Sequence, residues 1–440
     1  MLPLLALLPF LALTTALPAP SASGANVAPE STGTAITSKL PLKLLASRQY
    51  SDSLVERQAW LKHQAKSLQA KYALSLDEEW KKLIGMSKRD AGSVQLEDLN
   101  YDGTYAGTVS IGTPAQDLLL VLDTGSSDLW AAGSGCSADF CKDVETFNKN
   151  ASTSYQKADG TFRITYGSGS AAGDYATDVV DLAGFSLSNT TFAVVDQATS
   201  GLIDEPLSGI MGFGWTALAS SKAAPWWETL ASTGQWDDPE FGVHMARFRG
   251  VDSATKDEKE GGEITFGGVD SSKYSGDLNY ISIDDSAKDY WRIAVEGLSV
   301  NGDDISLSSP QAAIDTGTTL IGAPSSTISS IYAQIPNSEP LDSSVVGSAG
   351  YYQFPCNTTV SVKFTFGGEE YEMDGEDMNL GSFTDDESMC TGAFFEQQMS
   401  SSSPIQWIVG AAFLKNVYTA FRYEPTAIGF ASLLANGTSS

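Results

Sequence analysis

Two short motifs that could carry chemistry repeat within this chain of 440 residues. The triplet Asp-Thr-Gly stands at residues 123–125 and again at residues 315–317, each time after an apolar run and before two hydroxyl side chains. A single copy is expected by chance in roughly one such chain in ten and would indicate only a surface turn. Two copies with matching flanks indicate that Asp123 and Asp315 have related roles. A pair of carboxylates can supply both the base and the acid that hydrolysis by water requires.

A second motif, two apolar residues and a glycine, follows each acid at a similar distance. Gly212 ends the first copy, 89 residues after Asp123, and Gly410 ends the second, 95 residues after Asp315. Matching motifs at matching intervals indicate an internal duplication in which each of two diverged units contributes one acid.

Short β-strands are the elements expected to position these acids. Runs of β-branched and aromatic residues between Gly, Ser and Asn turns predict strands at residues 105–111, 117–122, 161–166 and 360–366. Helical patterns are few and short in this part. The sequence therefore predicts a mainly β body of two related lobes that meet near residues 267–276, with the acids in the crevice between them. We expect the charged run at residues 256–260 to be a solvated hairpin tip.

Further motifs around the acids match a known family. They are Ile-Gly-Thr-Pro-Ala-Gln at 111–116, Asp-Leu-Trp at 128–130, Tyr-Gly-Ser-Gly at 166–169, Gly-Gly-Val-Asp-Ser-Ser at 267–272 and Tyr-Trp at 290–291. With the doubled triplet, they resemble the pepsin-like aspartic endopeptidases from about residue 100 to residue 433. The resemblance implies a bilobal fold of two related β lobes with an active-site cleft between them. It also implies acid cleavage of proteins beside bulky apolar residues.

The resemblance makes Asp123 and Asp315 the catalytic pair. Two adjacent carboxylates cannot both ionise, so the pair shares one proton and activates a water molecule in acid solution. The residues after each acid are implied to hold it in place: the glycines admit backbone N–H groups, the next hydroxyls bond the carboxylates, and the threonines tie the turns together. These supporting residues are Thr124, Gly125, Ser126, Thr316, Gly317 and Thr318.

A β-hairpin is predicted 43 residues after Asp123, where alternating residues end in a Gly-Ser-Gly turn. It resembles the flap that closes over bound peptide in this family. The resemblance implies that Gly167 and Ser168 hydrogen-bond to the substrate and that Tyr166 bonds to Trp130.

Segments to be removed are expected before the body. Residues 1–16 carry no charge and are too few to span a bilayer, which predicts a signal peptide. Residues 17–89 have a net charge of +5 and residues 90–440 one of −33, with the dibasic pair Lys88 and Arg89 at the junction. We expect a propeptide at 17–89, an N-terminal lobe at 90–270 and a C-terminal lobe at 271–440. The product should be secreted, in preference to vacuolar, with no membrane anchor.

The propeptide is expected to act as an intramolecular inhibitor. Apolar residues at helical spacing precede Lys71 and Tyr72, and that pair resembles the inhibitory element of fungal aspartic protease precursors. We expect the Lys71 ammonium to lie between Asp123 and Asp315 at neutral pH. The alternative is that Lys71 is one solvated lysine of a helix.

Cysteines and sequons fit an exported protein. Four cysteines allow three disulfide pairings, of which Cys136 with Cys141 and Cys356 with Cys390 keeps each bridge within one lobe and also matches the family. Four sequons are glycosylation candidates: Asn150, Asn189, Asn357 and Asn436.

Other classes of protein are less consistent with this sequence. The acidic body argues against nucleic-acid binding. After residue 89 the only histidine is His244, so we expect no multi-histidine metal site, no cofactor and no serine-histidine triad. A monomer acting on protein or peptide substrates is expected. The alternative is a catalytically inactive pepsin-like binding or inhibitor protein, but such relatives lose an acid, a following hydroxyl or the flap tyrosine. The chain departs from the family at Ser208 and Ala411, where an aspartate is frequent.

Overall fold

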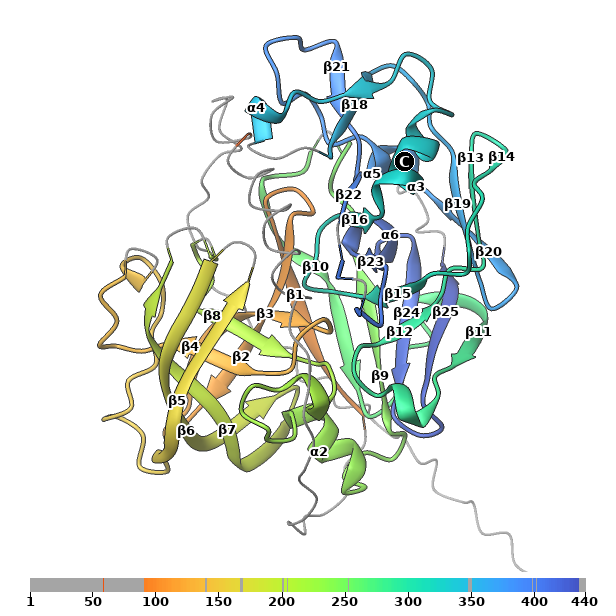
Figure 1. Ribbon diagram of the computed structural model, residues 1–440. Coiled ribbons are helices and arrows are strands. Elements are labelled where there is room, and N and C mark those ends of the chain that lie inside the picture. The colour runs from red at the N-terminus through yellow and green to blue at the C-terminus, as the bar shows by residue number, and fades with distance from the viewer. Residues whose placement is uncertain are drawn as a thin grey trace, which may run out of the picture. The chain divides into compact units, whose positions relative to one another are not determined.

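The computed structural model in Figure 1 describes residue 58 and residues 91–434, except 139–140, 167–168, 200–201, 204, 252, 347–349, 398 and 401. These residues belong to one compact unit, residues 37–440. The predicted signal peptide and dibasic pair lie outside the described residues, as do Lys71, Tyr72, Gly167, Ser168 and Asn436. The described part is mainly β, as the sequence predicts.

The largest sheet in the described part has thirteen strands and draws on both halves of the chain. Figure 1 shows β1, β10 and β9 side by side near its middle. In order across the sheet the strands are β11 (Tyr274–Ser282), β25 (Ala427–Leu433), β24 (Val417–Arg422), β9 (Glu240–Met245), β10 (Asp257–Phe266), β1 (Gly92–Leu99), β2 (Thr104–Ile111), β3 (Gln116–Asp123), β8 (Gly209–Gly212), β4 (Leu129–Ala132), β7 (Phe185–Ala198), β6 (Gly169–Leu182) and β5 (Gln156–Tyr166).

Three smaller sheets are formed by the second half. The first orders β12 (Arg292–Ala294), β15 (Gln311–Ile314), β23 (Trp407–Val409), β16 (Ile321–Ala323) and β22 (Phe394–Glu396). The second orders β14 (Asp303–Asp304), β13 (Gly297–Val300), β19 (Val362–Phe366) and β20 (Glu369–Met373). The third orders β17 (Glu339–Pro340), β18 (Tyr352–Pro355) and β21 (Met389–Thr391).

The helices of the described part are short. They are η2 (Thr216–Leu218), α2 (Trp226–Ser232), η3 (Asp285–Ala287), α3 (Ser325–Tyr332), α4 (Ser343–Val346), α5 (Gly375–Met378) and α6 (Ala411–Leu414). In α3 the buried residues Ile328, Ile331 and Tyr332 recur at spacings of three and one, so that one face packs on the core. Among the described residues no helix is long and apolar enough to span a bilayer.

The strand pairing repeats in the two halves, as the doubled motifs predict. In the first half β3 pairs parallel with β8, β8 antiparallel with β4, and β4 parallel with β7. In the second half β15 pairs parallel with β23, β23 antiparallel with β16, and β16 parallel with β22. Both acid-bearing strands, β3 and β15, therefore lie beside the strand of the downstream glycine motif.

The predicted strands are present with small differences in their ends, but one local prediction is wrong. Residues 257–260 of the charged run do not form a hairpin tip. They begin β10, where Asp257 and Glu258 pair with Leu99 and Asp98 of β1. The partner strand lies about 160 residues earlier in the chain, so the local charge pattern could not indicate it.

The two disulfides have the pairing that was predicted. Cys136 is joined to Cys141, and Cys356 is joined to Cys390. In the chain-entropy account the longer loop, with a sequence separation of 34, contributes more stability than the short one.

Candidate active site

Asp123 and Asp315 occupy corresponding positions at the ends of their strands. Asp123 is the last residue of β3 and lies opposite Gly212 of β8. Asp315 directly follows β15, whose last residue Ile314 lies opposite Val409 of β23. The two acids are 2% and 0% exposed. Apolar strands thus deliver both carboxyl groups into the interior, so their charge must be balanced by hydrogen bonds or a shared proton.

The Asp123 carboxylate is held by the residues that follow it. The Gly125 N–H donates to Oδ1 at 2.9 Å, and the Ser126 hydroxyl donates to Oδ2 at 2.5 Å. The backbone carbonyl of Asp123 accepts from the Phe213 N–H at 2.7 Å. The bonds to Oδ1 and Oδ2 together fix the orientation of the Asp123 carboxylate.

The Asp315 carboxylate has the same set of donors. The Gly317 N–H donates to Oδ1 at 3.0 Å, and the Thr318 hydroxyl donates to Oδ2 at 2.6 Å. The Asp315 N–H donates to the carbonyl of Val409 at 3.0 Å. The two carboxylates therefore have matching donors, a glycine N–H on Oδ1 and a hydroxyl on Oδ2.

Two threonines tie the acid-bearing turns to each other. The Thr124 N–H donates to Thr316 Oγ1, and the Thr316 N–H donates to Thr124 Oγ1, both at 3.0 Å. Each hydroxyl donates onward across the pair, from Thr124 to the Ile314 carbonyl at 2.8 Å and from Thr316 to the Leu122 carbonyl at 2.6 Å. All of these groups are buried, so the bonds do not compete with water.

Gly317 brings the two acids together. A Cβ atom at this position would lie 2.5 Å from Cγ of Asp123 and would overlap Oδ1 as well. Real side chains do not approach this closely, so only glycine allows the second turn to lie against the first carboxylate. The two triplets, 192 residues apart, thus form one site of paired carboxyl groups.

The comparisons with known proteins agree with this geometry. The family model described as eukaryotic aspartyl protease matches residues 104–433. The chain belongs to this family. It is 52% identical to major aspartyl peptidase 1 of Cryptococcus neoformans var. grubii serotype A, over 92% of this chain and 86% of that protein. It is 33% identical to an aspartic protease of Phaffia rhodozyma, over 78% of this chain and 80% of that protein. It is also 33% identical to pepsin A of Bos taurus, over 76% of this chain and 85% of that protein.

Membership of the family makes the protein an aspartic endopeptidase, a hydrolase of peptide bonds in protein substrates. The prediction of an active acid endopeptidase is therefore confirmed, in preference to an inactive binding protein. In the described residues no group of three or more His, Cys, Asp or Glu side chains has an arrangement that could hold a metal ion.

The hairpin that was predicted after Asp123 in the chain is present. Strands β5 and β6 pair antiparallel up to Tyr166 and Gly169. Gly167 and Ser168, which follow Tyr166 in the sequence, lie outside the described residues, and the Tyr166 side chain is not described either. Trp130, its predicted partner, lies on β4 and is fully buried.

Several contacts near the acids were missed by the sequence analysis. Asp128 accepts hydrogen bonds from the N–H groups of Ser220 and Ser221 at 2.8 and 3.0 Å, which anchors the loop after β8. Trp291 donates from its indole N–H to the Phe213 carbonyl at 2.8 Å. The Tyr-Trp motif at 290–291 marked Trp291 as a residue of interest, but the sequence did not predict its hydrogen bond to Phe213.

A cluster of buried charges lies where the start of the body meets its second half. The Lys415 ammonium contacts Asp102 at 2.6 Å and Asp377 at 2.5 Å, and Arg247 contacts Asp377 at 2.6 Å. Burial alone would raise the pKa of Asp377, but Lys415 and Arg247 hold it below its usual range. Removing Lys415 would leave the buried Asp102 carboxylate without this cation.

Asp98 borders this cluster without a cation of its own. Burial and the Asp102 carboxylate raise the pKa of Asp98 to about 8, against the smaller opposing effects of the Asp102 N–H and Lys415. Its Oδ2 accepts from the Asp102 N–H at 2.9 Å, and its Oδ1 is buried without a hydrogen-bond partner among the described residues. Asp98 is therefore protonated in acid solution.

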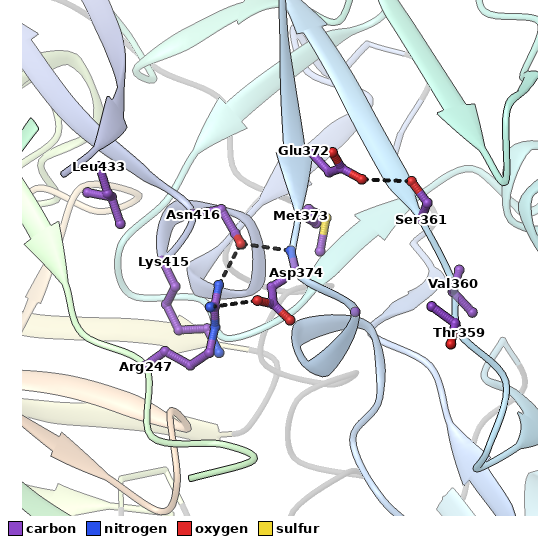
Figure 2. A pocket seen from close by; sticks show the side chains of 11 residues that line it. Arg247, Thr359, Val360, Ser361, Glu372, Met373, Asp374, Lys415, Asn416 and Leu433 are labelled. Carbon is purple, nitrogen blue, oxygen red and sulfur yellow. Dashed lines mark hydrogen bonds and ion pairs between the residues drawn. The ribbon is translucent and has the colours of Figure 1, made fainter. Parts of the chain in front are cut away.

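A cavity of about 500 Å³ opens next to the same cluster. Figure 2 shows Arg247 bonded to Asp374 and to Asn416 along one wall, and Glu372 bonded to Ser361 on the other. Neither catalytic candidate lines this cavity. The cations in its lining, Arg247 and Lys415, are paired with carboxylates, whereas Glu372 accepts from the Ser361 hydroxyl.

The two departures from the family pattern are both buried. Ser208 is 0% exposed, with a hydroxyl that has no partner among the described residues, and Ala411 is 1% exposed at the start of α6. His244 lies half-buried on β9, where burial and Lys273 lower its pKa, and it belongs to the sheet rather than to the acid pair.

Proposed function

We propose that Asp123 and Asp315 are the catalytic dyad of this endopeptidase. The observation that carries the proposal is the contact between Gly317 and the Asp123 carboxylate. It is supported by the matched donors on each acid and by the reciprocal bonds between Thr124 and Thr316. In the proposal Gly125, Ser126 and Thr318 orient the carboxylates.

The dyad works with one proton shared between its two acids. The ionised carboxylate takes a proton from water as the water oxygen attacks the carbonyl carbon of the peptide, and the protonated carboxyl group donates its proton to the carbonyl oxygen. Collapse of the tetrahedral intermediate breaks the carbon–nitrogen bond: one carboxyl group donates its proton to the leaving nitrogen, and the other carboxylate takes a proton from a hydroxyl of the intermediate, which restores the singly protonated pair. Because the hydrogen bonds of the two acids match, we assign the proton to the pair and not to one residue.

The acid requirement follows from the pairing. Coulomb repulsion between two adjacent buried carboxylates disfavours the doubly ionised form, and only the singly protonated pair contains both an acid and a base. Activity should therefore fall when both acids are ionised and when both are protonated.

Substrate is proposed to bind as an extended peptide under the β5–β6 hairpin, with Tyr166, Gly167 and Ser168 as the covering residues and bulky apolar side chains beside the cut bond. Closure of a hairpin excludes water from the reacting groups. The hairpin pairing up to Tyr166 and Gly169 supports this role.

The chain is proposed to be made as a secreted, monomeric zymogen with the boundaries predicted at residues 16, 89 and 270. Opposite net charges of residues 17–89 and 90–440 favour binding of the propeptide to the body. Gln58, in the proposed propeptide, donates to the Phe383 carbonyl at 3.2 Å, which supports such a contact. Among the sequons, Asn150, Asn189 and Asn357 are exposed.

One assay tests the proposed activity. The purified full-length precursor is acidified and incubated with denatured haemoglobin between about pH 3 and pH 7, with and without pepstatin. We expect pepstatin-sensitive cleavage with a maximum in the acid range. Cleavage that is greatest at neutral pH, or that pepstatin does not reduce, would contradict a mechanism that depends on a shared proton.

A further inference from the structure

A buried tryptophan connects the two acid-bearing segments. The Trp291 carbonyl accepts from the N–H of Ile314, the residue before Asp315, at 2.8 Å. Its indole N–H donates to the Phe213 carbonyl at 2.8 Å, and the Phe213 N–H donates to the Asp123 carbonyl at 2.7 Å. Three hydrogen bonds in series thus join the backbones of Asp123 and Asp315 through Trp291.

The indole cannot adjust its position easily. Trp291 is 0% exposed, and its ring lies 4.7 Å from the ring of Trp215, 5.3 Å from that of Trp227 and 5.2 Å from that of Phe421, measured between centroids. Phe213 is also buried, at 1% exposed. Because water does not reach this contact, removing the N–H would leave the carbonyl without this donor and allow the segment to shift.

The residue at the corresponding position of the first half makes a different contact. Arg292 pairs with Ala313, two residues before Asp315, and Ala106 pairs with Val121, two residues before Asp123. Tyr105 therefore corresponds to Trp291. Its hydroxyl donates instead to the Ala246 carbonyl at 2.7 Å. The two halves thus share the threonine bonds, but at this corresponding position the buried side chain of the second half, Trp291, reaches the segment of the other acid, whereas Tyr105 bonds elsewhere.

We propose that Trp291 is a positioning residue that sets the spacing of the Asp123 and Asp315 carboxylates. The inference rests on the proposed dyad and adds a residue that acts through it. The threonine bonds hold the turns at residues 124 and 316, whereas Trp291 holds the strands behind them. Since the interaction of two charges falls with distance, a small separation of the acids brings their two apparent pKa values closer together. A narrower pH profile of activity is the direct consequence.

The test compares Trp291→Phe with Trp226→Phe in the full-length precursor, activated in acid. Trp226 is a matched control, because it is 2% exposed and its indole N–H donates to the Val180 carbonyl at 3.3 Å. Both variants lose a buried indole donor and the same volume. The probe is an internally quenched peptide with two adjacent phenylalanines. The measurements are kcat, KM and the pH profile of kcat/KM, with thermal unfolding of each variant.

We expect Trp291→Phe to lower kcat by about tenfold or more with KM within about twofold, and to narrow the pH profile by about half a unit. Trp226→Phe should lose thermal stability but keep the kcat and the profile width of the wild type. Ionisable residues adjoin the rings that pack on the indole: Glu228 follows Trp227, Glu240 precedes Phe241, Arg422 follows Phe421, and Lys288 lies over the Trp215 ring. Asp289, Tyr290 and Arg292 adjoin Trp291 itself in the chain. All of them are unchanged in the variant, so a change in the width of the pH profile reports the dyad.

Equal kcat and profile width in the two variants would overturn the proposal. If Trp291→Phe does not fold, 3-benzothienylalanine is incorporated at position 291 instead. It keeps the bicyclic ring and replaces the N–H by sulfur, so unchanged kcat and profile width would also overturn the role of the hydrogen bond. Full activity in Asp315→Asn would refute the dyad itself, a result distinct from either outcome at Trp291.

Discussion

Thr124 and Thr316 hydrogen-bond to each other reciprocally, each N–H donating to the other's hydroxyl at 3.0 Å. Thr316→Val removes two of the four bonds in this arrangement and leaves the Thr124 N–H buried without its acceptor. We expect a loss of about 2–4 kcal/mol in the free energy of unfolding and a lower kcat. Urea unfolding and steady-state kinetics measure both. Thr161→Val on the exposed side of β5 is the control and should change neither.

Gly317→Ala tests how closely the two acids approach. The added Cβ would overlap the Asp123 carboxylate, so the turn must move and kcat should fall by about a hundredfold or more. Gly135→Ala adds the same methyl group where no atom lies within 4 Å and should retain activity within about twofold. Wild-type kcat in Gly317→Ala would show that the turns do not touch during catalysis.

Asp98 should make the protein less stable as the pH rises. Its pKa in the folded state is about 8, above the ordinary value of 3.8, because it is buried beside the Asp102 carboxylate. Between these values the folded state holds a proton that the unfolded state has lost. The free energy of unfolding therefore decreases as the pH rises from 3.8 through about 8.

Asp98→Asn removes this titration and keeps an oxygen that can accept from the Asp102 N–H. Its urea midpoint should vary less than that of the wild type between about pH 5 and about pH 8.5. Asp159→Asn, at an exposed position on β5, should behave as the wild type. Parallel curves for the wild type and Asp98→Asn would assign the loss of stability to other groups.

Lys71→Ala tests the proposed inhibitory lysine of the propeptide. If its ammonium lies between the acids at neutral pH, the variant precursor should process itself at a higher pH than the wild type, because the dyad no longer has to be protonated before the segment leaves. The pH midpoint of processing is read from the loss of the propeptide on gels. Lys62→Ala in the same segment is the control. Equal midpoints for Lys71→Ala and the wild type would assign the block to another residue.

The sequence could predict those parts of the fold that short segments encode. The doubled Asp-Thr-Gly triplet located both acids, and alternation up to Tyr166 located the hairpin, because turns and strand edges depend on residues close in the chain. The local disulfides followed from the division into two similar halves.

Long-range pairing could not be read in the same way. The charged residues at the start of β10 pair with β1, and β24 joins β9 in a sheet shared by both halves. Lys415 reaches Asp102, 313 residues earlier, and the Trp291 indole reaches Phe213. The residues around each of these positions do not predict its partner, because the partners are far apart in the chain and meet only in the folded protein.

The central claim is that one proton shared by Asp123 and Asp315 drives peptide hydrolysis. Its most direct test is kcat of Asp315→Asn in the acid-activated enzyme, with circular dichroism and thermal unfolding to show that the fold is intact. An amide cannot act as the base or share the proton, so kcat should fall by several orders of magnitude, roughly 10³-fold or more. A folded Asp315→Asn enzyme with kcat near that of the wild type would contradict the account.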